Sequence, residues 1–359
     1  MKKQHWSLYS MLVTKAENTT WRLLFCLYLL FLFLNRICAG DTTRGEPRDV
    51  DCSFGQAEGY WSGLSYHLFN ETCTLQRRVN ALYEQVRDGT DSKLKGSVLF
   101  VGDTIDRNLI NWIGEQFSST VDDLTPFREF ETSSGAPAST SLNRQVWVGD
   151  LHFANLYIFG VGEPPYPERA TQTWIKELHN HTVERLCVDA PHYLPVAPDI
   201  IVVNSAYWDA VKLCYSSTYA WRRKHDKKVN QPHCWKDTNI KWEKFVLEYM
   251  QDVYRLLLAA KTCYPSAKAV LWRTAPEVAV DDRSPWWHVI PPYVTSYLNN
   301  AARYAATKNS FELIQMDVMA AGRANDINWT PNGLHQSTSF NREYLNVVLN
   351  ILTEAFRRT

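Results

Sequence analysis

The chain has 359 residues, with 38 lysines and arginines balanced by 38 aspartates and glutamates, so its formal net charge is zero. Hydrophobic residues make up 45% of the sequence and charged residues 21%, which excludes a disordered or low-complexity chain. The balanced charge argues against a nucleic-acid-binding protein, because such proteins gain most of their affinity by neutralising phosphates. Aromatic residues make up 13%, which fits either a sugar-facing or a heavily packed protein.

An uncharged apolar run, LLFCLYLLFLFL, covers Leu23 to Leu34. It predicts a membrane segment at residues 21–40, preceded by a cytosolic leader at 1–20. The run is short for a span, and Cys38-Ala39-Gly40 offers small residues for cleavage, so a cleaved signal peptide and an uncleaved anchor both fit. The long basic leader favours the anchor, and the positive-inside rule then leaves the N-terminus cytosolic.

This topology predicts a single-pass type II membrane protein whose later residues face the Golgi or ER lumen, or a secreted protein if residues 1–40 are removed. Cysteine usage agrees with an oxidising compartment, because six cysteines follow the membrane segment. We expect Cys52 to pair with Cys73 in a Cys-linked segment at 41–96. The other four cysteines, which the pattern leaves unpaired, are Cys187, Cys214, Cys234 and Cys263.

Asparagine sequons at Asn70 and Asn180 predict lumenal glycosylation, whereas Pro331 disfavours the sequon at Asn328. The cysteines show no C-x-x-C spacing, so we expect neither a metal site nor a cofactor.

Strand and helix patterns then alternate along the chain. A helix is expected over 74–87, a buried strand over 97–101, a helix over 105–117 and a hairpin over 146–159. There follow a strand at 199–203, a long helix at 241–261, a strand at 269–273, a helix at 293–307, a strand at 311–318 and a helix at 339–356. This alternation predicts one α/β domain over 97–359, a three-layer sandwich with a mainly parallel sheet covered on both faces.

Ligand sites in such sheets lie at the carboxyl ends of the strands. There Thr104 presents a hydroxyl at a strand-to-helix turn, although it can equally serve as a helix cap. Asn204 follows the next strand and can donate to an oxyanion or form a turn. His335 precedes the last helix and can take a proton from a hydroxyl nucleophile. Their order along the chain favours a catalytic set.

The segments VGDTIDRNL, VVNSAYWD, VLWRTAPEV and MDVMAAGRANDINWTPNGLHQSTSFNREYL resemble successive blocks of the PC-esterase family, a branch of the SGNH hydrolases. The resemblance covers residues from about 98 to the C-terminus. It implies an SGNH-type fold and acyl-ester chemistry on glycans, with a Ser nucleophile, an Asp-x-x-His pair, and a Gly and an Asn in the oxyanion hole.

Matched to that pattern, Thr104 is the nucleophile, Asn204 the oxyanion asparagine and His335 the base. Two positions depart from it: Thr104 replaces the family's Ser, and Asn332 replaces the Asp. The threonine methyl group crowds the attack, and an asparagine cannot neutralise an imidazolium and can favour the wrong tautomer; in a serine protease the analogous change costs about 10⁴ in kcat.

Asp103 or Asp326 can restore the charge if either reaches the imidazole. The family's oxyanion glycine matches either Gly160 or Gly162. Arg273 follows a strand and can bind an anionic group or pair with a core carboxylate. Trp286 and Trp287 can stack on a sugar ring or simply pack in their loop.

Two functions follow from these residues. One is an acyl esterase or acetyltransferase acting on lumenal glycans. The other is a noncatalytic relative that keeps the pocket and binds a glycan or protein partner.

Overall fold

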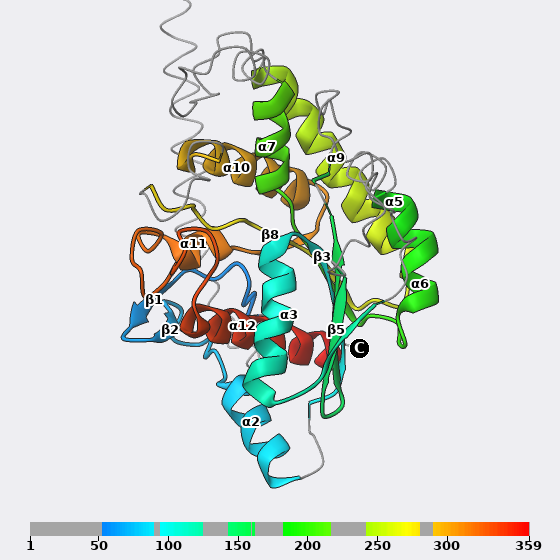
Figure 1. The fold of residues 1–359 in the computed structure, drawn as a ribbon, viewed down its shortest axis with the longest axis vertical. Helices are drawn as coiled ribbons and strands as arrows, with labels where there is room; N and C mark the ends of the chain where they lie inside the picture. Colours follow the sequence, from blue (N-terminus) through cyan, green and yellow to red (C-terminus); the bar gives the residue numbers. More distant parts are fainter. Residues whose placement is uncertain are drawn as a thin grey trace, which may run out of the picture. The chain divides into compact units, whose positions relative to one another are not determined.

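The computed structural model describes residues 52–89, 94–124, 143–158, 160–161, 182–216, 242–280 and 290–358. Its centre is a seven-stranded sheet in the order β4-β5-β6-β3-β7-β8-β9 (Figure 1). Strands β6, β3, β7, β8 and β9 run parallel, and β4 and β5 are antiparallel additions at one edge. In chain order the strands are β3 Gly96–Gly102, β4 Val121–Asp123, β5 Arg144–Val148, β6 Leu151–Tyr157, β7 Ile200–Val203, β8 Ala269–Arg273 and β9 Glu312–Ile314.

Helices cover both faces of this sheet, which confirms the expected mainly parallel α/β architecture. On one face α3 packs against β3, β5 and β6 and also contacts α12, while on the other α9 and α10 pack against β8 and against each other. The strand β3 is buried between these layers, which explains its continuous apolar sequence. The helices of this domain are α3 Thr104–Phe117, α7 Tyr207–Ser216, α9 Trp242–Cys263, α10 Pro292–Lys308, α11 Met316–Ala320 and α12 Thr338–Arg357.

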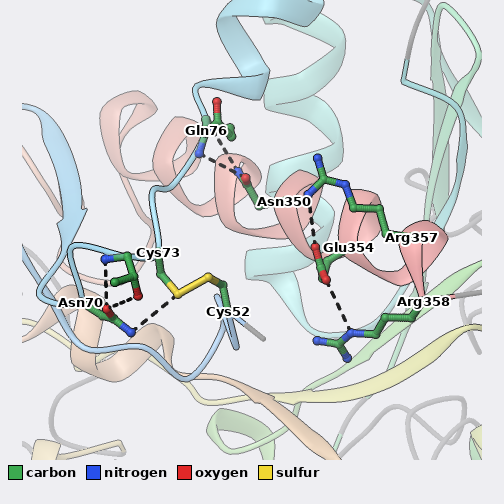
Figure 2. The surroundings of a disulfide bond; sticks show 9 residues. Cys52, Asn70, Cys73, Gln76, Asn350, Glu354, Arg357 and Arg358 are labelled. Carbon is green, nitrogen blue, oxygen red and sulfur yellow. Dashed lines mark hydrogen bonds and ion pairs between the residues drawn. A yellow bond between two sulfur atoms is a disulfide. The ribbon is translucent and has the colours of Figure 1, made fainter. Parts of the chain in front are cut away.

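The Cys-linked segment packs onto the domain through α12. It contains a hairpin that the sequence analysis missed, β1 Gly59–Ser62 with β2 Ser65–Leu68, followed by the helix α2 Arg78–Asp88. The predicted Cys52–Cys73 disulfide is present (Figure 2). Nearby, the backbone N–H of Gln76 donates to the Asn350 side chain of α12, and the Gln76 carbonyl accepts a hydrogen bond from the same side chain. Buried Glu343 of α12 also pairs with Arg77 at 2.5 Å.

A second disulfide joins Cys187 to Cys263 and so connects two of the cysteines that the sequence left unpaired. It ties α9 to a short helical stretch before β7, made of α5 Thr182–Glu184, η1 Arg185–Asp189 and α6 Ala190–Tyr193. The side chain of Cys214 and the whole of Cys234 lie outside the described residues.

Two predicted elements were wrong in extent. The helix expected from residue 74 begins only at Arg78, and the strand expected over 311–318 ends at Ile314. After Gln315, whose N–H donates to the Gly55 carbonyl at 2.7 Å, the chain turns into α11.

No helix among the described residues is long and apolar enough to cross a membrane. The predicted membrane run at 23–34 lies outside those residues.

Candidate active site

Thr104 lies at the junction of β3 and α3, where the sequence analysis placed it. The helix cap at this junction is Asp103, whose side chain accepts a hydrogen bond from the Ile105 N–H at 2.9 Å. Thr104, a partly exposed residue, is therefore the first helical residue rather than the cap, and its hydroxyl does not have to satisfy the helix end.

Beneath this junction lies a buried ion cluster that bears on two predicted site residues. Arg273, at the end of β8, is fully buried and pairs with Asp106 at 2.8 Å, while Asp103 lies 4.0 Å away. The structure thus decides between the two roles left open for Arg273, because it pairs with core carboxylates and is not exposed to a ligand. Asp103 is likewise buried and belongs to this ion cluster.

Burial and neighbouring charges act in opposite directions on the pKa values of Asp103, Asp106 and Arg273. Burial raises the pKa of Asp106 to about 6, although Arg273 acts to lower it, and burial also raises the pKa of Asp103. Burial acts to lower the pKa of Arg273, but Asp106, Tyr344 and Asp103 outweigh it and hold that pKa above its ordinary value. The arginine is therefore a fixed buried cation that requires its carboxylate partners.

Gly102 makes this cluster possible. A Cβ atom at this position would lie 1.7 Å from Asp106 Oδ2, so no larger residue fits beside the carboxylate. The same hypothetical atom would lie 3.6 Å from Asn204 Cβ, which places Asn204 directly beside the end of β3.

Asn204 follows β7 and is completely buried. Its N–H donates to the Val101 carbonyl at 2.9 Å, and its side-chain Nδ2 donates to the Arg273 carbonyl at 2.7 Å. An amide nitrogen carries two protons, so this bond uses only one of the two Nδ2 protons. Asn204 and Thr104 thus lie at the carboxyl ends of neighbouring strands, as the sequence predicts.

Gly160 is buried just past β6 and has a positive φ of 99°, a conformation that favours glycine. The next N–H, of Val161, donates to the Asp209 carboxylate at 3.1 Å, and Asp209 also accepts a hydrogen bond from Ser205. These bonds connect the chain after β6 to the residue that follows Asn204. Gly162, Trp286 and Trp287 lie outside the described residues.

His335 lies in a turn before α12 that is joined to the chain following β8, because the Ala279 N–H donates to the Gly333 carbonyl at 2.7 Å. The side chain of Asn332 shapes this turn. Its Oδ1 accepts hydrogen bonds from the backbone N–H groups of Leu334 at 3.1 Å and His335 at 2.8 Å. These two donors fix which end of the amide is oxygen.

The remaining end of the Asn332 amide then determines the tautomer of His335. Asn332 Nδ2 lies 2.8 Å from His335 Nδ1, and an amide nitrogen can only donate. Neutral His335 therefore accepts at Nδ1 and carries its proton on Nε2. This is the reverse of a serine hydrolase triad, where Nδ1 is protonated and Nε2 accepts the proton of the nucleophile.

The surroundings of His335 also oppose its protonation. Burial, and then the positive charge of Arg107, lower the pKa of His335 below its ordinary value. Within the described residues Nε2 has no hydrogen-bond partner, and the Asp326 carboxylate accepts from Asn328 instead. Neither Asp103 nor Asp326 hydrogen bonds to the imidazole in the described part of the chain, so neither is a carboxylate partner of His335.

The sequence analysis missed two residues of this site. Arg107 lies one helical turn after Thr104, and its guanidinium carbon is 5.7 Å from the ring centre of Tyr157 at the end of β6. The Tyr157 hydroxyl accepts a hydrogen bond from Trp208 Nε1 at 3.1 Å. Burial and Asp103 raise the pKa of Tyr157, while hydrogen bonds with Trp208 and Thr104 act to lower it. The spacing of three residues between Thr104 and Arg107 was the available signal.

Comparisons with known proteins were made at three levels. No protein-family model matches this chain, and no curated protein matches it. Among solved structures it is similar to a GDSL-like lipase from Bacteroides thetaiotaomicron, with 10% identity, 78% of this chain and 98% of the other covered, and a TM-score of 0.40.

It is also similar to a carbohydrate acetylesterase from Sinorhizobium meliloti, with 16% identity, 72% and 99% coverage and a TM-score of 0.37. A third similar structure is an acetylxylan esterase from Geobacillus stearothermophilus, with 14% identity, 73% and 96% coverage and a TM-score of 0.35. Similarity at this level carries no inference about the family or activity of this chain.

Proposed function

We propose that the chain is an SGNH-type acyl esterase or acyltransferase, with acetylated glycans as its substrate class, whose turnover is reduced by Thr104 and Asn332. The observation that carries this proposal is the neighbouring position of Thr104 and Asn204 at the ends of β3 and β7. Support also comes from the electrostatic effect of Arg107 on His335, because Arg107 follows Thr104 by one helical turn.

In this reaction the Thr104 oxygen attacks the acyl carbon, its proton passes to His335 Nε2, and the second Asn204 amide proton stabilises the oxyanion. His335 must therefore hold its proton on Nδ1. In this tautomer the Nδ1 proton faces the N–H of Asn332 instead of a carboxylate, which is unfavourable. The positive charge of Arg107 further disfavours the imidazolium. Proton transfer is thus the step that the two substitutions slow.

A second candidate is noncatalytic binding of a glycan or protein partner. The hydrogen bond from Asn332 to His335 favours it, because it leaves Nε2 as a donor at the position where a base must accept. In this function Thr104 and His335 present hydrogen bonds to the ligand without exchanging protons.

The two functions are distinguished by treating the purified full-length chain in detergent with a fluorophosphonate and assaying p-nitrophenyl acetate hydrolysis. Labelling on Thr104, lost in the nearly isosteric Thr104→Val variant, would establish the nucleophile. Absent labelling together with retained binding of acetylated xylo-oligosaccharides would favour noncatalytic binding. Loss of both would contradict an acyl-glycan site altogether.

We further propose that a type II anchor at residues 21–40 holds the domain in the ER or Golgi lumen. The basic leader supports this topology, as do the two disulfides among the described residues, because disulfides persist in oxidising compartments. Endoglycosidase treatment of the full chain expressed in eukaryotic cells should reduce its size. An unchanged size, with Asn70 and Asn180 both unmodified, would contradict a lumenal location.

A further inference from the structure

The β1–β2 hairpin exposes a row of aromatic rings on one face. The Tyr60 ring centre lies 5.5 Å from that of His67 and 5.5 Å from that of Phe69, and both contacts are stacked. Tyr60 is 48% exposed and Phe69 is 62% exposed. Trp61 and Tyr66 lie on the opposite face and pack into the core, so the exposed row is not needed to attach the hairpin.

Asn70, which begins a glycosylation sequon, directly follows this row. Asn70 and Thr72 are both exposed, and Asn70 Oδ1 accepts hydrogen bonds from the Thr72 N–H at 3.1 Å and the Thr72 hydroxyl at 2.7 Å. The Cys52–Cys73 disulfide holds the next turn of the chain in place, as Figure 2 shows. Asn70 is therefore exposed in the folded protein, and it directly follows the exposed ring of Phe69 in the chain.

The sequon at Asn328 differs in the exposure of its hydroxyl residue. Its hydroxyl residue, Thr330, is 1% exposed, and the Asn328 side-chain nitrogen donates to Asp326 at 3.1 Å. The hydroxyl residue of this sequon is therefore buried, whereas Thr72 is exposed, so the two sequons should differ in occupancy.

We propose that Asn70 carries an N-linked glycan whose first sugar residues pack on Phe69 and Tyr60. A pyranose ring has a face of C–H groups that stacks on aromatic rings, and contiguous exposed apolar surface commonly marks a binding contact. The glycan requires the lumenal location proposed above but is independent of any chemistry at Thr104.

Occupancy is tested on the full chain expressed in eukaryotic cells, by glycopeptide mass spectrometry. We expect a glycan on Asn70 in the wild type and in Thr72→Ser, which keeps the sequon, and none on Asn70 in Thr72→Ala. Asn328 should be unmodified. A glycan on Asn180 with Asn70 bare would overturn the proposal while leaving the lumenal location intact, and bare asparagines at both positions would overturn both.

Packing is tested by thermal unfolding with and without enzymatic deglycosylation. Removing the glycan from the wild type should lower Tm by about 1–3 °C, the change expected for loss of one stacking contact in a domain of this size. In Phe69→Ser and Tyr60→Ser the same treatment should lower Tm by less. Because both side chains are exposed, these variants should fold. Equal shifts in wild type and variants would show that the glycan does not pack on the rings.

Discussion

The two regions around Arg273 and His335 differ in whether a positive charge has a negative partner. Below the carboxyl edge of the sheet, the buried guanidinium of Arg273 faces the carboxylates of Asp106 and Asp103. At the rim, the imidazole of His335 faces the neutral amide of Asn332 and lies within the field of the cationic Arg107. The positive charge of Arg273 is therefore balanced by carboxylates, whereas a proton added to His335 would have no negative partner beside it.

The difference separates what folding requires from what catalysis requires. An arginine cannot deprotonate, so its carboxylate partner is necessary for a stable core. A histidine can simply remain neutral, so a neutral partner such as the Asn332 amide costs the fold little and bears mainly on the proposed proton transfer. Substitutions in the lower region should therefore change stability, and substitutions at the rim should change chemistry.

The largest effect on hydrolysis is expected from giving His335 a carboxylate partner, as Arg273 already has. Asn332→Asp supplies a negative partner to His335 and favours the Nδ1–H tautomer, and Thr104→Ser removes the methyl group that crowds the attack. The double variant should hydrolyse p-nitrophenyl acetate faster than either single variant, with an upper bound of about 10⁴ over wild type. Thr104→Ser alone, which keeps Asn332 and adds no charge, is the matched control. A folded but inert double variant would favour noncatalytic binding.

Breaking the lower region should cost the fold. Asp106→Asn leaves Arg273 as a buried cation without its closest carboxylate, and we expect a loss of about 3–5 kcal/mol in the free energy of unfolding. Glu312→Gln, which breaks the exposed pair with Arg358, should cost no more than about 1 kcal/mol. Chemical denaturation of both variants measures the contrast. Equal losses would mean that the cluster is not a structural requirement.

A third test asks whether stability responds to pH away from the site. His152 is buried between Ser97 and Gln145 near the amino-terminal ends of β3 and β6, and burial lowers its pKa to about 4 from 6.5. The unfolded chain binds this proton more tightly, so His152 contributes stability that is full above pH 6.5 and is lost as pH falls toward 4.

The expected loss over that window is roughly 3 kcal/mol. Denaturation of the wild type and of His152→Gln at a series of pH values isolates this contribution, because other titrating groups are common to both. Identical pH slopes would contradict the low pKa of His152.

The smallest effect concerns the charge beside His335. Because Arg107 contributes to its lowered pKa, Arg107→Gln should raise the pKa of His335 toward its ordinary value. NMR titration of the His335 ring measures this shift, and Asn332→Asp should raise the pKa further. No change in Arg107→Gln would mean that the guanidinium does not act on the imidazole.

The strand exits that carry Thr104 and Asn204 could be predicted because buried parallel strands leave continuous apolar runs, such as SVLFV before Gly102. The helices α3 and α12 were also predictable. Neither helix begins or ends more than one residue away from its predicted bounds. Short-range patterns were therefore sufficient to place the polar residues at strand ends.

Long-range partners were not predictable in this way. The α2 helix begins at Arg78, later than expected, where Asn346 and Asn350 of α12 accept hydrogen bonds from the N–H groups of Val79 and Gln76. These caps come from more than 260 residues away. Arg273 likewise finds Asp106 across 167 positions, and no local pattern contains that pairing. The strand predicted over 311–318 failed because its apolar run continues through the turn into α11.

The close approach of Asp106 to Gly102 has a consequence for sequence comparison. A glycine at this position is required whether or not the site is catalytic, because a larger residue would disrupt a buried ion pair needed for folding. Asp103 is required on similar grounds, as the cap of α3. Gly102 and Asp103 are thus explained by folding alone, and only Thr104 and the partner of His335 bear on the proposed chemistry.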